Sequence, residues 1–162
     1  MSKNISIIFI LTIYFLINSC GFKPIYKISD DNLEFRNYSV KIINQVSREV
    51  REEVSSNIFS EESLAYEVLL NIQEEQTPLI INSNGTVAKY RIEVSINFEI
   101  IKSDTKDIIS NGTTRGFAQY DVGESEFNNE DLKKRMVRNA AKNSLQIMTS
   151  KVESSIARAN DN

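Results

Sequence analysis

The chain has 162 residues, one domain's worth of sequence, with 19 Lys and Arg against 22 Asp and Glu and a formal net charge of −3. So mild and acidic a balance argues against a nucleic-acid partner, which requires a concentrated basic face. The chain contains no histidine, so no imidazole is available for metal ligation or catalysis.

A predominantly apolar run over residues 5–17 follows a single lysine, Lys3. Its length is that of the core of a secretory signal, and it is shorter than the roughly 20 residues that span a membrane. The run leads into Ile17-Asn18-Ser19-Cys20, where small residues precede a cysteine as in a lipobox. We therefore predict a lipoprotein signal peptide over residues 1–19, with Cys20 acylated as the first residue of the mature chain.

Acylation of Cys20 on sulfur and amine would anchor the chain to a membrane, since stable anchoring takes two lipid signals. Gly21 stands where lipoproteins kept in the inner membrane often carry Asp, so we expect the outer membrane, on its periplasmic side. Cys20 is the only cysteine, so no intramolecular disulfide can form and no free thiol remains. We predict no enzymatic activity, no metal and no cofactor. The alternative at this terminus is an uncleaved signal anchor with an incidental cysteine.

The mature chain divides into a tether and one domain. Residues 1–19 contain Lys3 and no acid, so the remainder has 18 basic and 22 acidic side chains and a formal charge of −4. Pro24 favours extended geometry at the residue before it, and residues 20–35 are expected to form a lipidated tether. The folded domain is predicted over residues 36–159.

Alternation of apolar and polar side chains predicts four strands. The expected ranges are residues 38–46, 66–81, 89–100 and 107–120. Pro78 predicts a bulge or an unpaired edge in the second strand, and Asn84-Gly85 predicts a hairpin turn before the third. Gly112 and Gly116 in the fourth strand predict bulges or the close approach of another backbone.

Two segments have the period of a helix. Valines recur every four residues after Ser47, which predicts a short amphipathic helix with that serine as its N-cap. A longer apolar stripe predicts a helix over about residues 129–159, and Ala140 and Ala141 narrow the stripe enough for close packing on a sheet. The order β-α-β-β-β-α predicts an α+β fold, with two helices packed on one face of a four-stranded mixed sheet and the other face wet.

Three stretches carry a resemblance to a known family. They are Cys20-Gly21-Phe22-Lys23-Pro24-Ile25-Tyr26, the run from Asn84-Gly85-Thr86 to Tyr90, and Phe117-Ala118-Gln119-Tyr120-Asp121-Val122 with the basic helix after it. The first resembles the Cys-Gly-Phe-x-Pro-Leu-Tyr start of mature LptE lipoproteins of alphaproteobacteria, with Ile25 in place of the usual Leu. The element order is also similar, so the resemblance covers nearly the whole mature chain.

The resemblance to the LptE family implies a non-enzymatic role in lipopolysaccharide assembly. Its members sit as a plug inside the outer-membrane β-barrel LptD, help that barrel to assemble, and are thought to bind lipopolysaccharide and ease its passage to the outer leaflet. A wet sheet face is compatible with a barrel lumen, which is polar.

Lipid A carries phosphates, so a lipopolysaccharide site should offer Lys or Arg. Lys89, Arg91 and Arg115 are the candidates on the wet face; the alternative is that they are ordinary solvated strand residues. A denser basic cluster lies on the last helix, where the alternative is a solvated helix face: Lys133, Lys134, Arg135 and Arg138.

Two other functions remain open. A free periplasm-facing lipoprotein could bind a lipid or a cell-wall component without a barrel partner. A lipid-modifying or hydrolytic enzyme would have to work with carboxylates alone, and no nucleophile or recognised ligand spacing accompanies them.

Overall fold

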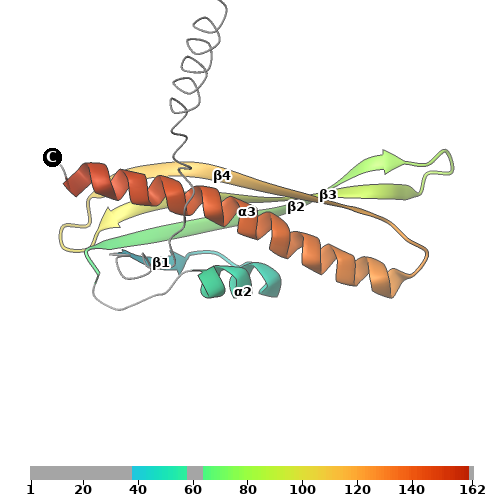
Figure 1. Ribbon diagram of the computed structural model, residues 1–162, viewed down its shortest axis with the longest axis horizontal. Coiled ribbons are helices and arrows are strands. Elements are labelled where there is room, and N and C mark those ends of the chain that lie inside the picture. The colour runs from blue at the N-terminus through green and yellow to red at the C-terminus, as the bar shows by residue number, and fades with distance from the viewer. Residues whose placement is uncertain (1–37, 58–63, 161–162) are drawn as a thin grey trace, which may run out of the picture. The chain divides into compact units, whose positions relative to one another are not determined.

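The computed structural model describes residues 38–57 and 64–160 (Figure 1). The elements are, in order, β1 (Tyr38–Ile42), α2 (Arg48–Asn57), β2 (Tyr66–Ile81), β3 (Val87–Lys102), β4 (Ile108–Asp121) and α3 (Glu126–Asn160). The strands lie in the order β1-β2-β3-β4; β1 pairs with β2 in parallel and the other pairs are antiparallel. The predicted α+β fold with a mixed four-stranded sheet is confirmed. The predicted signal peptide and tether lie outside the described residues.

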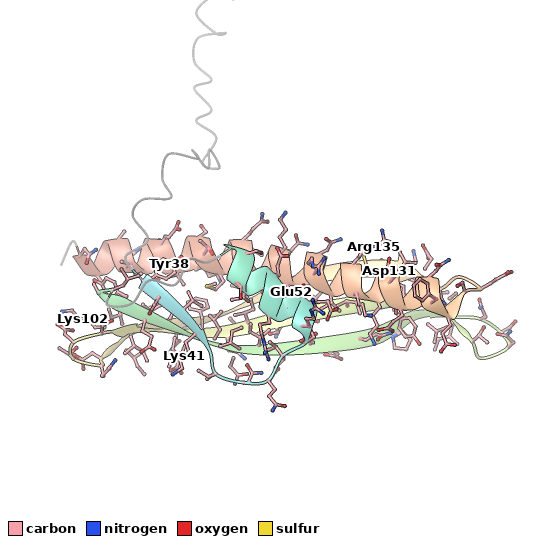
Figure 2. The ribbon with its side chains drawn as sticks, turned by 90° about the horizontal axis from the view of Figure 1, so that it is seen from below. Tyr38, Lys41, Glu52, Lys102, Asp131 and Arg135 are labelled. Carbon is pink, nitrogen blue, oxygen red and sulfur yellow. The ribbon has the colours of Figure 1, made fainter. Side chains whose placement is uncertain are left out.

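Both helices lie over the same face of the sheet (Figure 2). Side chains alternate along each strand, so one set points to the helices and the other to solvent. Along β3, Ile92 to Ile100 are buried at every second position, and the residues between them are exposed or half-buried. The core joins this row to Val68 and Leu70 of β2, Val50 and Val54 of α2, and the apolar stripe of α3. We call the other face, which neither of the two described helices covers, the open face.

The long helix lies unusually close to β4. A Cβ added at Gly116 would be 2.0 Å from the carbonyl oxygen of Ala140 and 2.6 Å from the amide nitrogen of Ser144. Only glycine fits there, because both neighbours are backbone atoms of α3. The close approach predicted from the two glycines and the narrow alanine stripe is thus confirmed at this point. One turn away, the buried hydroxyls of Thr114 and Ser144 lie 3.0 Å apart and share a hydrogen bond.

β1 is shorter than predicted, ending at Ile42 and not at residue 46. Beyond Ile42, the side chain of Asn44 makes the hydrogen bonds to β2 in place of the strand backbone. Its Nδ2 donates to the carbonyl of Ile72 at 2.7 Å, and its Oδ1 accepts from the amide of the same residue at 3.0 Å. Alternation alone cannot reveal this exchange of backbone for side-chain hydrogen bonds. The chain then enters α2, and Ser47 caps that helix as predicted, its Oγ accepting from the amide of Val50.

The last helix begins at Glu126, three residues before the predicted start. Ser125 explains the difference, since its Oγ accepts from the amide of Asn128 at 3.4 Å and its carbonyl from Asn129. Such capping outweighs the polar composition of the first turn.

The β2–β3 hairpin matches its prediction. Gly85 has φ of 85° in the turn, where its amide donates to the carbonyl of Asn82 at 2.9 Å. The predicted irregularity at Pro78 is a bulge, since the register with β3 shifts between Pro78 and Ile81.

Replacing Gly116 with Ala should lower the free energy of unfolding by about 3 kcal/mol, because the new methyl group must push the backbone of α3 off the sheet. Gly123→Ala is the matched control: its Cβ would meet only the side-chain oxygen of Asn129 at 3.7 Å, an ordinary contact. Urea unfolding of both variants measures the difference. Equal losses in the two variants would contradict the close packing.

Candidate functional site

The three predicted cationic residues all lie on the open face, but they do not form one cluster. Lys89 and Arg91 are near the start of β3, and Arg115 is on β4. In the β3–β4 register Arg91 is opposite Gln119, whereas Arg115 is opposite Ser95. Four residues along a strand therefore separate Arg115 from the Arg91 position, which is about 13 Å.

Each of these cations has a partner on the open face. The Nζ of Lys89 is 3.2 Å from the carboxylate of Asp121, directly opposite in the register. The Nε of Arg115 is 3.4 Å from Glu93, which stands between the two arginines. Such pairs contribute little to stability when exposed, so an incoming phosphate could compete for the same cations.

Arg91 interacts with an aromatic ring. Its guanidinium carbon lies 5.8 Å from the ring centroid of Phe117, whose side chain is 47% exposed. An exposed phenylalanine on a polar sheet face is unusual, and together with the arginine it offers a ligand one apolar and one cationic group side by side.

In the second basic cluster, on α3, the two arginines are engaged in ion pairs. Arg135 pairs with Asp131 one turn before it at 3.3 Å, and both project from the helix into solvent (Figure 2). Arg138 reaches Glu52 of α2 at 3.2 Å. Arg48 also contacts Glu52, and its hydrogen bond is the main reason that the pKa of this carboxylate is lowered. This network fastens α2 to α3 at the surface.

The open face also has a hollow that the sequence did not indicate. It measures about 280 Å³, and its polar lining consists of amides, a hydroxyl and one carboxylate: Asn71, Asn97, Glu99, Asn111 and Thr113. Apolar side chains of Ile43 and Leu69 border it. The signal that could have found it is Leu69, an apolar residue at a position where alternation calls for a polar one.

Behind Lys89 and Arg91, on the core face, two tyrosines stack. The rings of Tyr90 and Tyr120 have centroids 5.6 Å apart, and Gln76 Nε2 donates to the Tyr120 hydroxyl at 3.0 Å. Burial is the main cause that raises the pKa of Tyr120 above its usual value, with smaller contributions from Tyr90 and Glu130.

Neither a metal-binding cluster nor a membrane-spanning helix is found in the described part of the chain. Within residues 38–57 and 64–160, no His, Cys, Asp or Glu side chains gather in a group of three that could hold a metal ion. In the same part of the chain, neither helix has the length and apolar character of a membrane span. Cys20, the predicted lipidation site, lies outside the described residues.

Comparison with known proteins decides the family. A model of the LptE family, described as lipopolysaccharide-assembly, matches residues 27–147, most of the chain. This chain belongs to the LptE family. Membership implies a role in lipopolysaccharide assembly, and it confirms the resemblance seen in the sequence.

Solved structures of bacterial lipoproteins share the fold. One from Caulobacter crescentus CB15 has a TM-score of 0.57 at 11% identity, with 78% of this chain and 93% of that chain covered. A minor lipoprotein from Acinetobacter baumannii gives 0.52 at 15% identity, covering 75% and 91%. Lipoprotein B from Nitrosomonas europaea gives 0.51 at 10%, covering 75% and 86%. No curated protein matches the sequence.

The raised pKa of Tyr120 makes a prediction about alkaline stability. The pKa of Tyr120 is higher in the folded than in the unfolded state, so the neutral hydroxyl contributes to the free energy of unfolding. This contribution is fully present below about pH 10 and is lost as the pH rises through the folded-state pKa. In Tyr120→Phe this loss is absent, so its free energy of unfolding should decline less above that pH. Urea unfolding from neutral to alkaline pH tests this. Parallel declines in variant and parent would contradict it.

Proposed function

We propose that this LptE-family chain is an outer-membrane lipoprotein, held on the periplasmic side by acyl groups on Cys20. In this proposal it plugs the lumen of the LptD β-barrel, helps that barrel to assemble, and assists the transport of lipopolysaccharide to the outer leaflet. The observation that carries the proposal is the family match over residues 27–147, on a fold that leaves a polar sheet face uncovered.

The surface of the domain supports a position inside a barrel. A barrel lumen is polar, so a plug needs polar groups on more than one side. The open face supplies them along three strands, among them Gln73, Ser95 and Asn97. The outer side of α3 supplies exposed lysines and amides, among them Lys142 and Gln146. The core is enclosed between the two layers, so a barrel would cover the polar groups of these surfaces together with exposed apolar side chains such as Phe117.

The proposed role needs binding and positioning, with no bond made or broken. Cations on the open face could hold lipid A phosphates, and the exposed ring of Phe117 beside Arg91 could contact an apolar part of the same lipid. The pairing of Lys89 and Arg115 with acids would keep such binding weak, which suits a lipid that must be passed on.

The barrel partnership is tested by co-purification. A C-terminal tag on the full chain, mild detergent extraction of outer membranes and identification of the co-eluting proteins measure the partner and its stoichiometry. We expect one large β-barrel protein at close to one-to-one. The lipoprotein eluting alone would contradict the plug and favour the free lipid- or cell-wall-binding alternative.

The anion contacts are tested by Lys89→Ala, Arg91→Ala and Arg115→Ala together, which should weaken binding of lipopolysaccharide to the purified protein about tenfold. Glu93→Gln should act in the opposite direction, because it releases Arg115 from its ion pair. A charge-matched control replaces three α3 cations with Ala: Lys133, Lys134 and Arg135. If the control loses as much affinity as the first triple variant, the assignment to the open face is wrong.

A further inference from the structure

A groove runs along the outer edge of β4, where α3 crosses it. It measures about 330 Å³, near the small end of the range for ligand sites. Gly112 and Phe98 are both in its lining, and the Phe98 ring takes the space that a Cβ at Gly112 would need, 2.8 Å from that position. We call it the edge groove. Four serines and two cations supply most of its polar lining: Ser110, Ser150, Ser154, Ser155, Lys151 and Arg158.

We propose that the edge groove binds a phosphate-bearing anion. Phosphate oxygens only accept hydrogen bonds, and the groove is rich in groups that donate them: serine hydroxyls, an ammonium and a guanidinium. Lys151 gives one of its three N–H bonds to the carbonyl of Thr113 at 3.2 Å, which fixes the ammonium at the groove and leaves two donors. Arg158 adds the planar fork that suits two phosphate oxygens.

The charged side chains in the described lining of the groove are Lys151 and Arg158. Its lining, all of it in the described part of the chain, includes no acidic residue. The nearest acid in the α3 sequence, Glu153, is two residues from Lys151 and therefore on nearly the opposite side of the helix. Lys151 is hydrogen-bonded to the carbonyl of Thr113, whereas Lys89 and Arg115 on the open face are each paired with a carboxylate.

The outer edge of β4 is closed to another strand. Besides the bond from Lys151, Asn143 Nδ2 donates to the carbonyl of Phe117 at 3.3 Å, so two carbonyls that face outward from β4 already accept hydrogen bonds. Ser155 and Ser110 link helix and strand across the groove at 3.4 Å. These contacts favour a small polar ligand over an added strand.

The groove lies in a different place from the proposed lipopolysaccharide contacts, and ligand binding there does not depend on the barrel. It lies between α3 and the edge of β4, whereas Lys89, Arg91 and Arg115 project from the open face. It also needs no barrel, so its occupancy can be measured on the purified full mature chain. Absence of phosphate binding in the groove would leave the proposed barrel partnership unaffected. Failure to co-purify with a barrel would likewise leave the groove proposal unaffected.

Titration with inorganic phosphate, followed by amide chemical shifts of the detergent-solubilised mature lipoprotein, tests the groove. We expect saturable shifts centred on residues 110–112 and 150–158. Lys151→Gln with Arg158→Gln should weaken binding about tenfold, and Arg158→Gln alone about threefold, since each removes one charge-assisted contact. The single variant keeps the Lys151–Thr113 bond and so guards against a folding defect.

The matched control is Lys134→Gln with Lys142→Gln, two exposed cations of α3 outside the groove. It removes the same charge and should change the affinity less than twofold. Equal losses in the two double variants, or shifts spread evenly over the surface, would overturn the proposal, because binding would then follow net charge alone.

Two further titrants distinguish the source of the phosphate. A phosphomonoester glycolipid and phosphatidylglycerol, each in mixed micelles, are compared with the inorganic ion. Tighter binding of either lipid, lost in Lys151→Gln with Arg158→Gln, supports a lipid headgroup as the ligand. Equal affinity for the free ion supports a soluble phosphate. Absence of saturable binding by all three titrants would contradict the groove as a phosphate site.

Discussion

The contact of α3 with β4 at Gly116 is the constraint on which the rest of the domain depends. Two backbones meet there without a side chain between them, so the helix lies directly on the sheet and the Thr114–Ser144 hydrogen bond is buried beside it. With α3 in this position, Val50 and Val54 of α2 join the same core, and the Arg138–Glu52 ion pair connects the two helices. Both described helices are then on one side of the sheet, and the open face is left to solvent or to a partner.

The open face and the edge groove represent two ways of presenting positive charge. On the open face, Lys89 and Arg115 are each paired with an acid, and an incoming anion has to compete with it. In the edge groove, Lys151 is held by a backbone carbonyl and hydroxyls surround it. If both bind phosphate, the open face should exchange its ligand readily and the groove should hold a ligand for longer. Weak, exchangeable contact is the property that a transport role in lipopolysaccharide assembly would require.

The elements that sequence analysis predicted well are those set by local chemistry. The alternation of apolar and polar residues predicted β2 and β3, Asn84-Gly85 predicted the turn between them, and Ser47 predicted the start of α2. The close packing of helix and sheet was also predictable, because glycines in the fourth strand and alanines in the helix stripe have side chains small enough to let the two backbones approach. The end of β1 was not predictable. The side chain of Asn44 makes the hydrogen bonds to Ile72 that a strand backbone would otherwise make, and only the tertiary structure reveals this.

The candidate site was predicted less completely than the fold. Alternation correctly placed Lys89, Arg91 and Arg115 on one face, but their separation depends on the β3–β4 register, which was not known from sequence. The hollow beside Leu69 and the edge groove were missed, since each combines residues far apart in the chain. Serines on a helix and an arginine near its end give no recognisable pattern until β4 is packed beside them.

Thiol labelling in outer membranes would test most directly whether this domain is enclosed by a barrel. Cys20 is the only native cysteine, so Asn97→Cys on the open face or Gln146→Cys on the outer side of α3 would each supply a single free thiol in an acylated chain. A bulky maleimide should label both positions slowly in native membranes and rapidly after the barrel protein is depleted. Rapid labelling at both positions with the barrel present would contradict a plug and leave the domain exposed to the periplasm.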